Sequence, residues 1–287
     1  MIKQASAAQL KAVLRARYGP ASTADVQFKN ANQSSAKPWL TGVAAIDECL
    51  PEGGLSRAGL HEIEPLKPSD MPSLTGFGFA LLSRLASTKP IIWCVTASQV
   101  GDYGQPYAFG LSRFGISPSQ IIFAKVAKDK ELPFALEEAI KTQGIAAVIG
   151  EGSRPCFTGS RRIALLCQTH QTPCLFMTPR RGDHNGSAAL TRWQIAPQQG
   201  VEDPRDPFGP GLPSWAVGLP RARAGRAMPG MEPADLTYTS NHTQPYPWRI
   251  IWDDQTLSFR PASVLRHRAT HQTASQQYDA QKAMVGR

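Results

Sequence analysis

The sequence lacks several features that would assign it to whole classes of protein. It contains no run of about 18 apolar residues, the length that a transmembrane helix needs. Residues 1–18 have no continuous apolar stretch, so we expect no secretory signal. The five cysteines are odd in number and form no Cys-x-x-Cys pair, which favours a reduced, cytoplasmic protein without a metal site. Charged residues reach only 18% against 41% hydrophobic ones, so the 287-residue chain can build a sizeable core.

Glycine, proline and arginine, by contrast, are plentiful. The 24 glycines and 24 prolines predict long irregular stretches. The formal net charge is +9, and fifteen of the 16 basic residues beyond residue 150 are arginines. Arginine suits phosphate or planar partners better than lysine does. A GC-rich genome would give the same bias, and composition alone leaves both explanations open.

The middle of the chain alternates short apolar runs with helical patterns. Strands are predicted at residues 60–63, 91–95, 121–126, 145–149, 174–177 and 193–196. Helices are predicted between them, at residues 77–85, 107–114, 132–142 and 160–170. This spacing is typical of crossover units, so we expect an α/β fold with a mainly parallel sheet and helices on both faces.

The two ends of the chain have a different character. Residues 5–17 carry apolar side chains at helical steps, and the polar residues 20–36 resemble a linker. Residues 198–235 are rich in proline and glycine and predict an irregular segment. Two strand patterns, 248–252 and 256–259, then predict a β-hairpin before a polar tail. We therefore divide the chain into an N-terminal helix and linker (1–36), a core (37–197) and a C-terminal region (198–287).

The most informative motif spans residues 41–65 and reads TGVAAIDECLPEGGLSRAGLHEIEP. It resembles the segment that leads into the phosphate loop of the RecA recombinase family. That resemblance implies a RecA-like core and, in an active member, a following GxxxxGK[ST] loop. Residues 66–78 instead read LKPSDMPSLTGFG. We therefore expect a degenerate phosphate loop, marked by the residues Pro65, Lys67, Pro68, Gly76 and Gly78.

Two further positions of the RecA resemblance concern catalysis. The position of the glutamate that orients the attacking water is taken by Ser98, and the position of the magnesium-holding aspartate is taken by Glu151. Phosphoryl transfer depends on positioning and electrostatic stabilisation, so these losses predict a pseudo-ATPase with no cofactor and no catalytic residue.

The second half extends the resemblance to the DNA-binding loops of RecA, in the stretches SRRIALLCQTHQTPCLFMTP and RRGDHNGSAALTRWQIAP. The degenerate loop, the Thr191-Arg192-Trp193 strand and the Trp248-Arg249 hairpin together resemble the ImuA family of SOS-mutagenesis proteins. Membership would imply a non-enzymatic accessory protein of translesion DNA synthesis. Its expected partners are an ImuB-like inactive Y-family polymerase and an error-prone polymerase of the replicative α-subunit type. RecA and single-stranded DNA are further candidates.

Two other functions stay open at this point. One is a regulator that binds RecA or a cell-division protein, and the other is a RecA-like nucleotide-binding ATPase. For each function the RecA layout implies that the N-terminal helix docks on a partner or on a second copy. The candidate DNA or partner contacts are Arg180, Arg181, Arg192, Arg221, Arg223, Arg226, Trp248 and Arg249. For several of these, a solvated loop or core packing is the competing interpretation.

Overall fold

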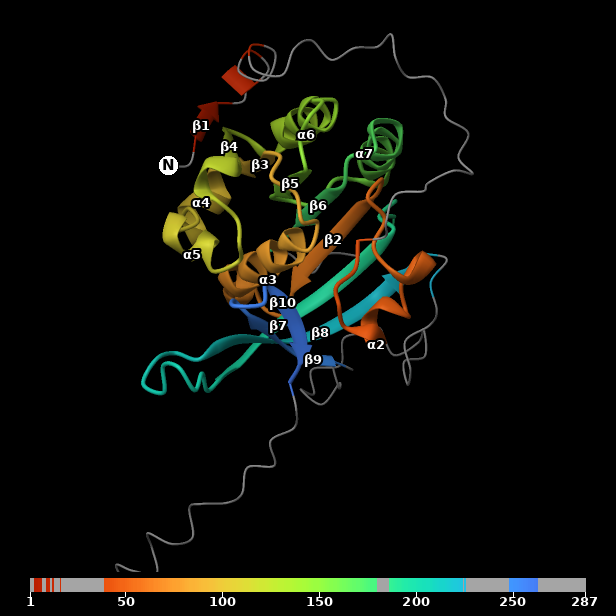
Figure 1. Ribbon diagram of the computed structural model, residues 1–287. Coiled ribbons are helices and arrows are strands. Elements are labelled where there is room, and N and C mark those ends of the chain that lie inside the picture. The colour runs from red at the N-terminus through yellow and green to blue at the C-terminus, as the bar shows by residue number, and fades with distance from the viewer. Residues whose placement is uncertain are drawn as a thin grey trace, which may run out of the picture.

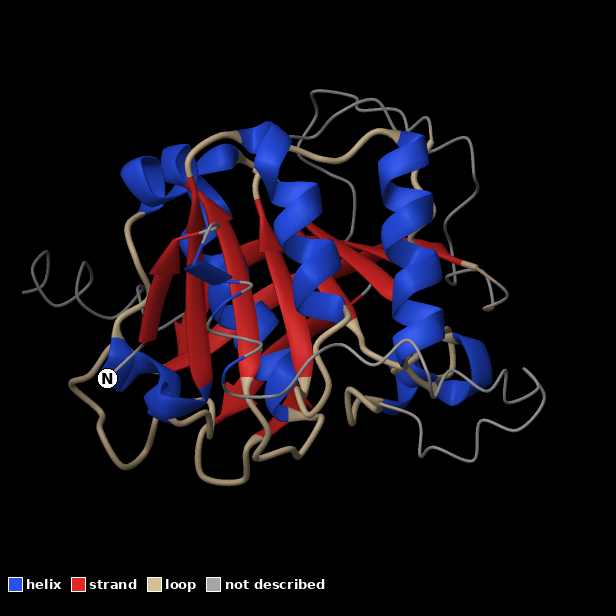
Figure 2. Ribbon diagram, turned by 90° about the horizontal axis from the view of Figure 1, so that it is seen from above, coloured by secondary structure: helices blue, strands red, loops and turns tan. Residues whose placement is uncertain are grey.

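The computed structural model describes residues 3–6, 9, 10, 12, 16, 39–179, 186–223, 225 and 248–262. These residues build one ten-stranded sheet with the strand order β1-β4-β3-β5-β6-β2-β7-β8-β9-β10. Helices cover both of its faces (Figures 1 and 2). The protein is therefore an α/β protein with a large, mostly parallel sheet, consistent with a RecA-like core.

The first seven strands in this order run parallel to one another. They are β1 (Lys3–Ser6), β4 (Ile121–Val126), β3 (Ile91–Thr96), β5 (Ala147–Glu151), β6 (Cys174–Met177), β2 (Leu60–Pro65) and β7 (Thr191–Val201). All residues of β2, β3, β5 and β6 are buried, because helices cover these strands from both sides. The apolar runs of β3, β5 and β6 made these strands predictable, whereas β2 also buries polar side chains.

The last three strands extend the sheet with antiparallel pairing. They are β8 (Leu212–Ala222), β9 (Trp248–Asp253) and β10 (Ser258–Pro261). The predicted C-terminal hairpin is confirmed as β9 and β10. Trp252 is fully buried and Trp248 packs against the same core cluster, as core packing of the hairpin requires.

The α-helices are α2 (Ala44–Asp47), α3 (Met71–Ser83), α4 (Ala97–Tyr103), α5 (Ala108–Ser112), α6 (Leu132–Ile140) and α7 (Phe157–His170). Short 3-10 turns occupy Pro51–Gly53, Pro68–Asp70, Pro118–Gln120 and Asp129–Glu131. Helix α3 and the aromatic residues of β8 to β10 fill one face of the sheet, whereas α6 and α7 fill the other. The sheet thus has two separate hydrophobic layers.

Two sequence predictions about the ends are wrong. Residues 3–6 form strand β1 on the free edge of β4, where pairing satisfies their backbone groups and overrides helical propensity. Residues 9, 10, 12 and 16 are helical, but Leu10 is buried in the cluster beneath α6 and α7. This part of the N-terminus therefore packs on its own core, not on a partner. The predicted linker, 20–36, lies outside the described residues.

The prediction of an irregular segment at 198–235 is also wrong for residues 198–201 and 212–222, which belong to β7 and β8. Strand β7 runs across the boundary placed at residue 197. Pro213 and Pro220 of β8 fall opposite the two register shifts of the β7–β8 ladder, where no proline N–H is needed. The prolines that signalled a loop are thus accommodated by two irregularities in the ladder.

Candidate functional site

The segment between β2 and α3 is where a RecA-like fold would hold a nucleotide phosphate. It is a tight turn, since β2 ends at Pro65 and α3 begins at Met71. The backbone N–H of Lys67 donates to Asp70 Oδ2 at 3.1 Å, and the N–H of Asp70 donates to the Lys67 carbonyl at 2.9 Å. Pro68 and Pro72 have no N–H. Two donors of a phosphate loop are therefore missing at the prolines, and those of Lys67 and Asp70 are already used within the turn.

Charge makes the same turn unsuitable for an anion. A helix N-terminus favours negative charge, and here the carboxylate of Asp70 already occupies the position before α3. The side chain of Lys67 is exposed to solvent. A phosphate at this turn would therefore be repelled by the Asp70 carboxylate, which lies before the helix.

Gly76 and Gly78, predicted as part of the loop, lie inside α3. This corrects the sequence alignment, which placed the start of the helix six residues too late. A Cβ on Gly78 would lie 3.3 Å from Met177 Sδ and 3.4 Å from Leu175 Cδ2. The glycine therefore allows α3 to approach β6 closely, and its role is helix–sheet packing.

Glu151, at the former magnesium position, ends β5 and is buried among apolar side chains. Its Oε2 accepts a hydrogen bond from Trp93 Nε1 at 3.0 Å. Burial raises the pKa of Glu151 to about 7, although the bond from Trp93 lowers it in part. A buried carboxyl group that is protonated about half of the time at neutral pH, and that already accepts a hydrogen bond from an indole N–H, is a poor magnesium ligand.

Ser98, at the former catalytic glutamate position, lies in the first turn of α4. Its hydroxyl is 3.0 Å from that of Thr96, which caps α4 by accepting from the N–H of Gln99. Neither hydroxyl can act as a strong base at neutral pH, so this position orients a helix and cannot activate a water molecule.

The turn before α3, Glu151 and Ser98 together show that this edge of the sheet lacks the groups for phosphate binding and hydrolysis. It offers neither the lysine nor the amide nest that phosphate binding requires, and its buried acid Glu151 is engaged by tryptophan. A scan against known protein families finds no match. Two curated relatives named Protein ImuA, from two strains of Caulobacter vibrioides, are each 31% identical to the chain over 201 residues. The aligned region covers 64% of this chain and 78% of each relative. The chain belongs to the ImuA family.

A buried ionic network lies on the opposite face of β2 in this ImuA-family chain. Arg192 Nε donates to Glu62 Oε2 at 3.0 Å, and Arg154 Nη2 donates to Glu64 Oε2 at 2.6 Å. Gln194 Nε2 adds a bond to Glu64 Oε1 at 3.1 Å. Arg192 was a candidate for DNA contact, and its burial corrects that prediction. The alternation of Glu62 and Glu64 along β2 was a signal for this network that sequence analysis did not use.

His61 of β2 is buried beside Thr191 of β7, and both of its ring nitrogens have a hydrogen-bond partner. Its Nε2 lies 2.8 Å from the Ser56 carbonyl, which fixes Nε2 as the protonated nitrogen. Its Nδ1 then accepts from the Thr191 hydroxyl at 2.8 Å, and that oxygen accepts from Trp193 Nε1 at 2.9 Å. Burial lowers the pKa of His61 to about 4, so the imidazole is neutral.

The structure describes three of the other candidate arginines, Arg221, Arg223 and Arg249. Arg221 is half-buried and Arg223 is more exposed, and both donate to the carbonyl of Ser187, at 2.9 and 3.1 Å. Both arginines therefore hold the segment that leads into β7. The sequence had suggested instead that they lie in an irregular loop. Arg249 is exposed on β9. Arg180, Arg181 and Arg226 lie outside the described residues.

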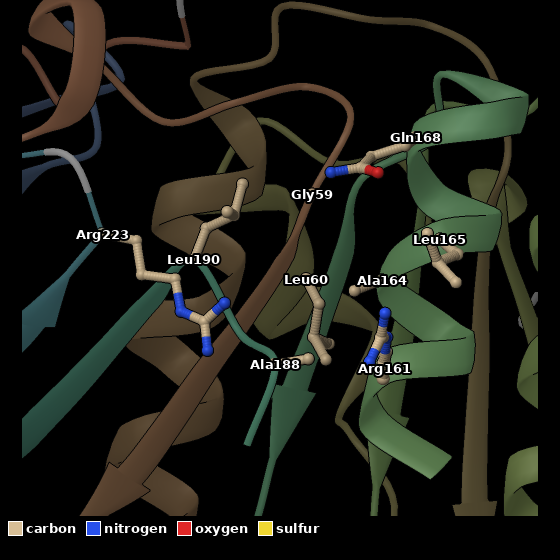
Figure 3. Close-up of a pocket in the computed structure, with 9 residues that line it drawn as sticks. All are labelled: Gly59, Leu60, Arg161, Ala164, Leu165, Gln168, Ala188, Leu190 and Arg223. Atoms are coloured by element: carbon tan, nitrogen blue, oxygen red, sulfur yellow. The ribbon is translucent and has the colours of Figure 1, made fainter. Parts of the chain in front are cut away.

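Arg223 also borders a shallow pocket of about 150 Å³ (Figure 3). Leu60 and Ala188 lie near its centre, with Leu190 and Arg223 on one side and the helix α7 on the other. Arg161 and Gln168 of α7 supply the polar part of that wall. The pocket combines an apolar floor with two cationic groups, and it is a surface where a partner side chain could bind.

Proposed function

We propose that this chain is a non-enzymatic accessory protein of SOS-induced translesion DNA synthesis. Membership of the ImuA family supports the process, and the closed turn before α3 is the observation that supports the lack of catalysis. A pseudo-ATPase keeps the large sheet as a rigid scaffold while the surface groups contact partners.

The proposed partners are an ImuB-like inactive Y-family polymerase and an error-prone polymerase of the replicative α-subunit type. RecA and single-stranded DNA remain secondary candidates. The pocket with Arg161 and Arg223 supports contact with an acidic or phosphate-bearing group. Among the described residues, no helix is both long and apolar enough to cross a membrane. We further propose that the protein acts in the cytoplasm, where its free cysteines would stay reduced.

Nucleotide binding and turnover test the non-enzymatic part of this proposal. We expect no magnesium-dependent ATP hydrolysis above the rate of a buffer blank and no saturable binding of a fluorescent ATP analogue. Glu151→Gln is the matched control, because glutamine keeps the acceptor for Trp93 but cannot ionise. ATP turnover by the wild-type chain that disappears in Glu151→Gln would show a working ATPase and contradict the proposal.

A further inference from the structure

The strands β7 and β8 continue beyond the core as a two-stranded ribbon, drawn in teal at the lower left of Figure 1. Burial falls along β7 from complete at Thr191 to exposed beyond Pro197. The turn at its end, residues 202–211, carries Phe208, which is 99% exposed. A large apolar side chain in this position contributes nothing to the core, and water contact over its whole ring is unfavourable.

The turn that carries Phe208 is held by its own bonds. Arg205 Nε and Nη2 donate to the two carboxylate oxygens of Asp203, at 2.7 and 2.8 Å. The N–H of Asp206 donates to the Asp203 carbonyl at 2.9 Å, and the N–H of Gly209 donates to the Asp206 carbonyl at 3.1 Å. Pro204, Pro207 and Pro210 fix further backbone angles. Binding through this turn would therefore cost little conformational entropy.

The ribbon is also tied to the body of the protein. Asp254, in the turn between β9 and β10, accepts from Arg205 Nη2 at 3.4 Å on one oxygen. Its other oxygen accepts from Arg113 Nε at 3.0 Å, just beyond α5. Arg205 thus shapes the turn and also links it to the hairpin beside it. The position of Phe208 relative to the core is defined by these contacts.

Charge around the turn identifies the class of partner. Glu202, Asp203 and Asp206 carry three negative charges and Arg205 one positive charge, giving a net charge of −2 in a chain whose total is +9. A nucleic acid would be repelled here, because its phosphates carry the same sign. A protein pocket with an apolar interior and basic residues at its rim is complementary both to Phe208 and to this charge.

We propose that the β7–β8 turn is a protein-docking element in which Phe208 inserts into an apolar, basic-rimmed pocket of the partner. This inference rests on the proposed function, since it takes the inactive Y-family polymerase as the partner that carries the pocket. A single exposed aromatic residue on a pre-ordered turn is the arrangement expected of an interface anchor.

The test measures binding of the full-length chain to the purified inactive Y-family polymerase by titration calorimetry. Phe208→Ala should weaken the affinity roughly 30-fold or more, the size of effect that defines an anchor residue. Phe134→Ala is the matched control, because Phe134 is also exposed, at 56%, but lies on α6. Glu202→Lys should slow association without changing the fold, since it removes the acidic character of the turn.

Each outcome has a distinct meaning. Normal binding by Phe134→Ala and weak binding by Phe208→Ala, with equal urea midpoints, support the anchor. Equal affinities of Phe208→Ala and wild type would overturn the anchor while leaving the proposed function intact. No binding by the wild-type chain would overturn both. Loss of single-stranded DNA affinity in Phe208→Ala, measured in parallel, would identify a nucleic-acid contact and overturn the protein-docking role.

Discussion

Replacing Glu151 with glutamine should change the pH dependence of stability in a predictable direction. Glutamine has nearly the same shape and keeps an oxygen for Trp93 Nε1. In the folded wild type, burial raises the pKa of Glu151 to about 7, from the value of 4.5 that an exposed glutamate has. The folded state therefore binds more protons than the unfolded state between these values, and wild-type stability falls as pH rises through that window.

The magnitude follows from the pKa shift. A shift of this size corresponds to roughly 3 kcal/mol of stability, most of which is lost between pH 5 and pH 8. Glu151→Gln cannot lose this contribution. From pH 5 to pH 8, the free energy of unfolding of the variant should therefore rise by about 2–3 kcal/mol relative to that of wild type, so that the variant gains relative stability.

Urea denaturation at the two pH values measures this difference. His61 titrates in both proteins with the opposite linkage, so its effect cancels when the variant is compared with wild type. Glu48→Gln, at an exposed position just after α2, is the control for replacing a glutamate that is not buried. A pH-independent difference for Glu151→Gln would refute the conclusion that this carboxyl is buried and protonated.

Three further predictions concern the core. Arg192→Met should destabilise the fold by about 3 kcal/mol, because Glu62 would lose its nearest buried cation and keep only Arg154, at 3.7 Å, whereas Lys141→Ala should cost under about 1 kcal/mol; similar urea midpoints for the two would contradict the network. Deleting residues 1–10 should lower thermal stability, since β1 and Leu10 are removed, and leave partner affinity unchanged; the reverse result would restore a docking role for the N-terminus. The stability advantage of wild type over His61→Gln should shrink by up to roughly 3 kcal/mol as pH falls from 6.5 to 4, because the unfolded histidine then binds the proton that the buried one excludes; an advantage that stays constant over this range in denaturation curves would contradict a neutral His61.

Periodicity was sufficient to predict the central sheet but not its edges. Strands such as Ile91–Thr96 are apolar throughout because both faces are covered, and their sequences alone carry that information. Strand β1 has no such pattern, since it forms by pairing with the free edge of β4. Strand β8 was hidden by Pro213 and Pro220, whose tolerance depends on ladder irregularities that only the partner strand reveals.

The candidate site could likewise be predicted only in part from the sequence. The family pattern was sufficient to predict that Ser98 and Glu151 stand at the former catalytic positions and that the phosphate-binding lysine is missing. Their surroundings could not, because the bond from Trp93 to Glu151 joins residues 58 positions apart. The burial of Arg192 likewise depends on Glu62, 130 positions away. A charge that looks available in the sequence is neutralised by a partner that only the fold brings near.

The most direct test of the account is whether the chain associates with an inactive Y-family polymerase without nucleotide. The two purified proteins would be mixed and analysed by size-exclusion chromatography with light scattering, in buffer with and without magnesium-ATP. A scaffold without a phosphate site predicts the same complex, with the same affinity, in both buffers. Absence of a complex, or a complex that forms only with magnesium-ATP, would contradict the central claim.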